Sequence, residues 1–128
     1  MKANVIVTPN FQREAKKLIR KYRSLKSELS DLAEELEENP RTGTLISQDT
    51  YKLRLAVKSK GKGKSGGMRV ITYVEVEVIE NEEKTDVYLL PIYDKSKYEN
   101  ISDKVLEGLI SEVQSEIEKE KQAKGEEE

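Results

Sequence analysis

The residues best suited to chemistry in this chain are seven cations that share one stretch with no carboxylate between them. They are Lys52, Arg54, Lys58, Lys60, Lys62, Lys64 and Arg69. Lys52 and Arg54 are two residues apart, so in a strand their side chains project from one face, about 7 Å from each other. Arg presents a planar fork to phosphate oxygens and Lys a compact positive charge, so the spacing predicts a phosphodiester-binding surface. The alternative interpretation is a solvated face that keeps the protein soluble.

The residue types that are missing narrow this chemistry. The 128 residues include no His and no Cys. Disulfides, thiolate zinc sites and a cysteine nucleophile are therefore excluded, and the commonest general base is missing. The carboxylates show no metal-ligand spacing, so neither a metal site nor a cofactor is predicted.

A glycine-rich stretch, 61–67, invites comparison with a phosphate-binding loop. Gly63-Lys64-Ser65 matches the last three positions of that motif. Its first glycine, however, would fall at Lys58, and the pattern that follows is that of a strand where the motif requires a helix. Nucleotide hydrolysis is therefore not expected.

Charge is segregated into blocks, although the formal net charge is only −2 and charged residues make up 38% of the chain. Residues 11–26 are basic, 27–39 are acidic, and 112–128 carry three Lys against seven Glu. We interpret the first two blocks as helices whose charges pair with each other. The acidic end is either a solubilising extension or a mask for the basic face in the free protein.

Hydrophobic periodicity predicts one α+β domain over residues 1–117 and a charged, disordered tail over 118–128. Thr8-Pro9 predicts the start of a helical hairpin, and Asn39-Pro40 predicts its end. Period-two alternation predicts later strands, and Ser102 caps a final helix. The expected order is β-α-α-β-β-β-α, with the hairpin packed on a mainly antiparallel four-stranded sheet whose strands are 5–7, 51–57, 68–79 and 87–93. A turn is expected at 81–84.

Several segments together are similar to the RelE/ParE superfamily of bacterial toxins over about residues 4–112. The resemblance rests on the opening strand and on four motifs: Asn39-Pro40-Arg41-Thr42-Gly43, Tyr51-Lys52-Leu53-Arg54-Leu55, Gly67-Met68-Arg69-Val70-Ile71, and Ile92-Tyr93-Asp94-Lys95-Ser96 before a terminal helix. It implies a RelE-like fold and the toxin of a type II toxin–antitoxin pair. The RelE/HigB-like branch consists of mRNA interferases that cleave message in the ribosomal A site, and the ParE branch inhibits DNA gyrase.

The resemblance also implies roles for individual residues. Lys52 and Arg54 match paired basic residues on the second strand, Arg69 opens the third, and Lys95 follows the fourth. The family also uses a catalytic tyrosine in the C-terminal segment. Tyr98 and Tyr93 lie near that position, neither at the expected spacing, and Ile101 is closer to it. In a metal-independent attack by a ribose 2′-hydroxyl, Lys52 would be the base, because crowded cations favour a neutral amine. Arg54 and Arg69 would clamp the phosphate, Lys95 or Tyr98 would protonate the leaving oxygen, and further RNA contacts would come from Lys58, Lys60, Lys62 and Lys64.

The expected partners are a cognate antitoxin protein, mRNA and the ribosome. The opening residues 1–7 predict neither a secretion signal nor a membrane span, so a cytoplasmic protein without membrane contact is expected. Two alternatives remain open from the sequence: a ParE-like gyrase inhibitor and a non-catalytic nucleic-acid-binding module.

Overall fold

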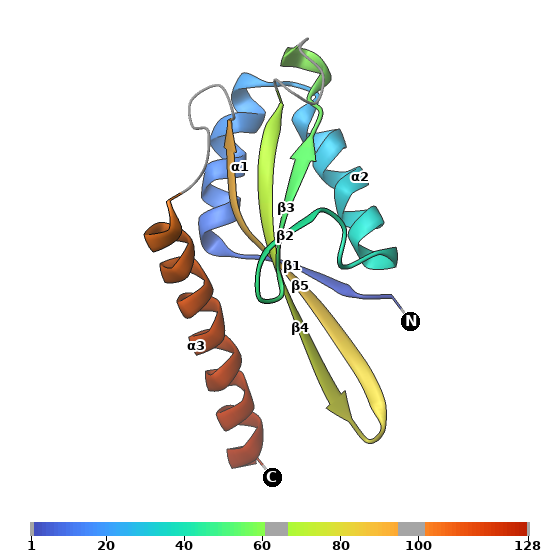
Figure 1. Ribbon diagram of the computed structural model, residues 1–128, viewed down its shortest axis with the longest axis vertical. Helices are drawn as coiled ribbons and strands as arrows, with labels where there is room; N and C mark the ends of the chain where they lie inside the picture. Colours follow the sequence, from blue (N-terminus) through green and yellow to red (C-terminus); the bar gives the residue numbers. More distant parts are fainter. Residues whose placement is uncertain (1, 61–66, 95–101, 128) are drawn as a thin grey trace.

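A computed structural model of the chain describes residues 2–60, 67–94 and 102–127. Three helices accompany a five-stranded, mostly antiparallel sheet with the order β1-β5-β4-β3-β2, in which only β1 runs parallel to its neighbour (Figure 1). The α+β class is therefore confirmed. The elements are β1 (Asn4–Val7), α1 (Pro9–Lys21), α2 (Leu25–Glu38), β2 (Thr44–Ser47), β3 (Thr50–Leu55), the short 3-10 helix η1 (Lys58–Lys60), β4 (Met68–Ile79), β5 (Glu82–Asp94) and α3 (Asp103–Glu127).

The expectation of four strands is wrong, because β2 adds a fifth at the edge of the sheet. It pairs with β3 through a tight turn in which Asp49 adopts a left-handed backbone with φ of 54°. All four of its residues are exposed. A short edge strand with no buried face has no alternation of apolar and polar residues, so the sequence pattern does not reveal it.

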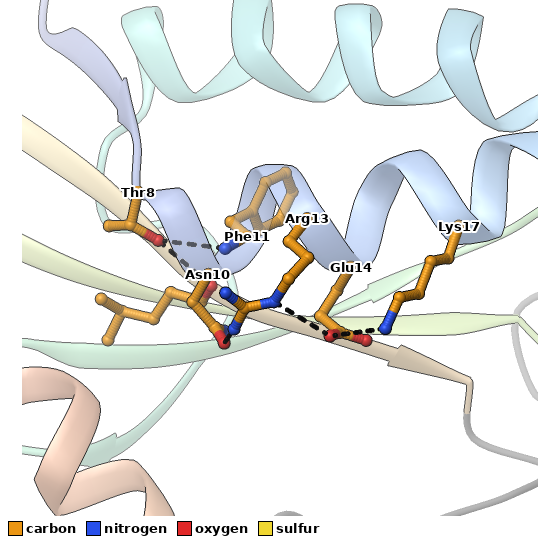
Figure 2. Close-up of polar contacts among 7 residues, drawn as sticks. Thr8, Asn10, Phe11, Arg13, Glu14 and Lys17 are labelled. Carbon is orange, nitrogen blue, oxygen red and sulfur yellow. Dashed lines mark hydrogen bonds and ion pairs between the residues drawn. The ribbon is translucent and has the colours of Figure 1, made fainter.

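The start of α1 is tied to the centre of the sheet (Figure 2). The Thr8 hydroxyl accepts a hydrogen bond from the Phe11 backbone N–H at 3.3 Å and donates one to the Leu89 carbonyl at 2.7 Å. Pro9 follows in the first turn, where its missing N–H leaves no helical hydrogen bond unmade. The predicted helix start is confirmed, and the same side chain anchors the helix to β5.

Helices cover both faces of the sheet. One core joins α1 and α2 to the sheet through residues such as Phe11, Leu25 and Leu36. A second core joins α3 to the opposite face, where Leu106 and Val113 pack with Tyr88 and Leu90 (Figure 1). Residues 87–94 of β5 are consequently all buried, as expected of a central strand.

The strands β4 and β5 form a long hairpin that extends beyond α1 and α2 (Figure 1). The predicted boundaries of β4 are confirmed, but β5 starts five residues earlier than the pattern suggested. The turn is the two-residue pair Glu80 and Asn81, with φ of 52° and 69°, rather than 81–84. Both residues are left-handed, which matches the twist of the flanking strands.

The final helix begins as predicted, since the Val105 N–H donates to the Ser102 hydroxyl at 3.3 Å. α3 then continues to Glu127 and includes most of the charged segment expected to be a disordered tail. Glu, Lys, Gln and Ala dominate that segment and are good helix formers. The division of the chain at residue 117 stays a prediction. Within the described ranges, no helix combines the length and apolar character needed to cross a membrane.

Candidate nucleic-acid interface

Two arginines meet at one end of the sheet. Arg54 of β3 lies directly opposite Arg69 of β4 in the antiparallel register, and Lys52 lies opposite Ile71. Because residues two apart in a strand share a face, Lys52, Arg54 and Arg69 all lie on the face of the sheet that α3 partly covers. We call Arg54 and Arg69 the arginine pair.

The members of this cluster differ in exposure. Arg54 is exposed and Lys52 is half-buried, whereas only 3% of Arg69 is accessible to solvent. One terminal nitrogen of Arg69 donates to the Met68 carbonyl at 3.1 Å. The pKa of Arg69 is lowered, first by burial and then by the positive charge of Arg54. The two guanidinium groups therefore interact electrostatically, with Arg69 beneath the surface and Arg54 at it.

Tyr93 extends the arginine pair onto a third strand. It is the direct partner of Arg69 in the register between β4 and β5, and its phenol acts on Arg69 in the opposite sense to Arg54, raising the arginine's pKa. Tyr93 is 8% exposed. A row of side chains thus crosses β3, β4 and β5 at the end of the sheet where β3 and β5 finish and β4 begins (Figure 1).

The sequence pattern does not reveal that Tyr93 lies on the face of the arginine pair, because β5 is irregular. The register shifts between Val70 and Thr72, where two residues of β5, Leu90 and Pro91, lie against one residue of β4, Ile71. Tyr88 and Tyr93, at even and odd positions, consequently fall on the same face and share the core beneath α3. Pro91 lies within this irregularity, where its missing N–H is tolerated.

Lys60 is held in a buried ion pair and is not exposed on the surface, and its predicted RNA contact stays a prediction. Its side chain is 7% exposed and its Nζ lies 2.5 Å from Oδ1 of Asp94, a side chain that is 2% exposed. The Tyr22 hydroxyl donates to the other oxygen of Asp94 at 3.2 Å, and the Lys60 ammonium lies 5.1 Å from the centre of the Tyr22 ring. The three side chains form a largely buried cluster that joins η1 to the end of α1 and to β5.

The remaining predicted residues divide into one that is described and four that are not. Lys58 is exposed, and its backbone N–H donates to Glu28 at 2.8 Å, which anchors the start of η1 to α2. Lys58 is therefore accessible to a polyanion. Lys62, Lys64, Lys95 and Tyr98 lie outside the described residues.

The basic face of α1 is a second cationic surface. Its ion pairs in the described part of the chain stay within the helix, where Glu14 lies 3.8 Å from Arg13 and 3.6 Å from Lys17 (Figure 2). None of the described ion pairs joins α1 to α2, contrary to the favoured interpretation of the two charge blocks. Lys16, Arg20 and Arg23 are exposed. This surface lies on the opposite side of the sheet from the arginine pair.

In the described ranges, no three carboxylates gather into a group that could hold a metal ion. A comparison of the chain with models of known protein families finds no match. What the arrangement can do chemically therefore rests on the cluster itself: an exposed guanidinium, a buried one beside it, an amine on the same face and a phenol at the far end of the row.

Proposed function

We propose that this protein is the toxin of a type II toxin–antitoxin pair and acts as an endoribonuclease on mRNA. The observation that carries the proposal is the cross-strand position of Arg54 against Arg69, with Lys52 on the same face of the sheet. The RelE-like fold belongs to this proposal. The α+β architecture with a helical hairpin supports it, and β2 is an addition to the expected strand order.

Two adjacent guanidinium groups are suited to a phosphodiester. Like charges that face each other across a strand pair destabilise the free protein, and the pKa of Arg69 is lowered first by burial and then by that repulsion. An anionic phosphate that binds the exposed guanidinium of Arg54 replaces this repulsion with attraction to both charges, because Arg69 lies directly across the strand pair. The low dielectric around a buried guanidinium strengthens that attraction. The arginine pair is therefore a preformed clamp for a charge that the substrate brings.

The proposed reaction is transesterification followed by release of the downstream RNA. Lys52 accepts the proton of the ribose 2′-hydroxyl, and the 2′-oxygen forms a bond to the adjacent phosphorus. The bond from phosphorus to the 5′-oxygen breaks, which leaves a 2′,3′-cyclic phosphate and a 5′-hydroxyl. Arg54 and Arg69 stabilise the extra negative charge that develops on the phosphoryl oxygens.

The leaving 5′-oxygen needs a proton donor near the clamp. Tyr93 is the described phenol in the row, because it neighbours Arg69 across the β4–β5 pairing. Lys95 follows β5 by one residue, and both Lys95 and Tyr98 remain predictions for the same role. Lys58 contributes a flanking phosphate contact. The remaining partners, a cognate antitoxin and the ribosome, are proposed because the exposed cations suit an acidic segment and ribosomal RNA.

The test measures cleavage of a single-stranded RNA by the purified protein, alone and with ribosomes. Fragments should end in a 2′,3′-cyclic phosphate and begin with a 5′-hydroxyl. The Arg54→Ala and Lys52→Ala variants should lose about 100-fold or more in rate, as expected for one group that stabilises or activates the transition state. Arg20→Ala is the matched control, since Arg20 is exposed on α1 on the other side of the sheet, and it should cleave at the parental rate.

Mapping mRNA ends after induction of the protein in cells decides between this proposal and its alternatives. New ends within codons support the ribonuclease. Intact message with an induced DNA-damage response overturns it in favour of a gyrase inhibitor. RNA binding without cleavage, unchanged by Lys52→Ala, overturns it in favour of a non-catalytic binding module.

A further inference from the structure

A cleft of about 530 Å³ opens between α3 and the segment that joins β1 to α1. Its walls come from Ile6–Asn10, from β5 and from α3, and it includes none of Lys52, Arg54, Arg69 or Tyr93. The volume lies within the range of about 300–1,000 Å³ that is typical of small-molecule sites. The cleft is thus a separate feature from the proposed nuclease centre.

The floor and the rim of the cleft have different chemistry. The floor is apolar, from Ile6, Leu90, Leu109 and Val113. The rim on α3 carries Glu112, Glu116 and Glu120, which follow one another at intervals of four and so line one face of the helix, together with Lys119. In the described part of the chain none of these four rim residues takes part in an ion pair.

A buried phenol, Tyr88, also lines the cleft. It is 8% exposed, and no hydrogen bond to its hydroxyl is formed among the described residues. Two other tyrosines have hydrogen-bond partners: Tyr73 accepts from Gln114 at 3.2 Å and Tyr22 donates to Asp94. A ligand in the cleft that offers a partner to this hydroxyl adds a hydrogen bond there.

The surroundings of Tyr88 favour a positive ligand. Its pKa is raised to about 12, first by burial and then by the negative charges of Asp86, Glu120, Glu75 and Glu77. The hydroxyl is therefore protonated at neutral pH and lies in a field of carboxylates from the sheet on one side and from α3 on the other. A cation placed there is attracted by the same charges that oppose ionisation of the phenol.

We propose that this cleft binds an organic cation with an apolar body, of the class of aryl-alkyl ammonium compounds. The apolar body packs on Ile6, Leu90 and Val113. The ammonium donates a hydrogen bond to the Tyr88 hydroxyl oxygen and lies toward the carboxylates of Glu116 and Glu120. Three carboxylates against one ammonium on the rim disfavour an anion of the same shape.

The test titrates the full chain with three probes that share one apolar body and differ in charge: phenylbutylammonium, phenylbutanol and phenylbutyrate. Binding is followed by chemical-shift changes of backbone amides. Phenylbutylammonium should bind about 10-fold more tightly than phenylbutyrate. Near a protein surface, the attraction of the rim carboxylates for a cation and their repulsion of an anion differ by about 1.4 kcal/mol or more, which corresponds to that ratio. The alcohol should fall between them, and the shifts should centre on residues 6–10, 88–90 and 109–120.

Variants separate the contacts. Tyr88→Phe keeps the ring and should weaken phenylbutylammonium about 10-fold or more, the effect of one hydrogen bond to a charged group. Glu116→Gln with Glu120→Gln should reduce the preference of the cleft for the cation over the alcohol. Glu107→Gln is the matched control, because Glu107 is an exposed α3 carboxylate outside the cleft, and it should leave all three affinities unchanged.

A further variant keeps the proposal testable if Tyr88→Phe does not fold. Ser115 is exposed and lines the cleft, so Ser115→Trp should fill its mouth and abolish binding without touching the core. Equal affinity for the three probes, shifts centred away from the cleft, or undiminished binding to Ser115→Trp would each overturn the proposal.

Discussion

Replacing Lys60 by alanine should destabilise the protein strongly, although Lys60 belongs to a lysine-rich stretch that resembles a surface loop. Its ammonium and the Asp94 carboxylate are 7% and 2% exposed and lie 2.5 Å apart. Lys60→Ala leaves the Asp94 carboxylate buried without its ammonium partner, although the hydrogen bond from the Tyr22 hydroxyl remains. Removing one partner of a buried ion pair costs about 3–5 kcal/mol, a large part of the stability of a domain of this size.

Urea denaturation followed by circular dichroism measures this cost. Lys58→Ala is the matched control, since Lys58 is exposed two residues away, and it should change the free energy of unfolding by less than about 0.5 kcal/mol. The double variant Lys60→Met with Asp94→Asn removes both charges and should recover most of the loss, because no buried charge remains uncompensated.

RNA affinity provides the opposing readout. If Lys60 were an exposed RNA-binding residue, Lys60→Ala would weaken RNA binding and leave the urea midpoint unchanged. The expected urea midpoint of Lys58→Ala is the reference for an unchanged one. A Lys60→Ala protein that unfolds at the parental urea concentration would refute the buried ion pair as a stabilising element.

Two further changes should act through burial and backbone geometry. The pKa of Tyr88 is raised from 10.0 to about 12 in the folded protein. The protonated phenol therefore contributes stability that is fully present below pH 10 and is lost as the pH rises toward 12. The free energy of unfolding should therefore fall by up to about 3 kcal/mol over that interval, and Tyr88→Phe should lack this part of the fall in urea titrations at each pH. Gly67→Ala would put a Cβ atom 2.0 Å from the Leu55 carbonyl oxygen, a backbone atom that cannot rotate away. It should cost about 1–3 kcal/mol or more, seen as a lower Tm, whereas Gly108→Ala, with open space at that position, should not lower Tm.

Strand periodicity was sufficient to predict the faces of the cationic side chains. Lys52 and Arg54 alternate with buried Tyr51 and Leu53, and Arg69 has the opposite parity to buried Met68. Because the side-chain period of a strand is two, this information is local. The antiparallel register then brings Arg54 against Arg69, as expected from two strands joined in sequence order.

Burial that depends on distant residues could not be predicted in the same way. Lys60 is 34 residues from Asp94 in sequence, and nothing in the local pattern distinguishes it from Lys58. The face of Tyr93 depends on an irregularity in β5, and strict alternation from Tyr88 would have put the two tyrosines on opposite faces. Edge strand β2 has no buried residue, so no apolar pattern identified it.

The sheet face that α3 partly covers is electrostatically divided along its length. Lys52, Arg54 and Arg69 lie at one end, and Glu75 and its cross-strand partner Asp86 lie toward the other. Tyr73 and Tyr88, paired between the two ends, are buried beneath α3. A polyanion is therefore attracted to the cationic end and repelled from the cleft, whereas an organic cation is attracted to the cleft and repelled from the arginine pair. One sheet face can thus hold ligands of opposite charge without competition between them, because the acidic end carries Glu75, Glu77 and Asp86 against Lys84.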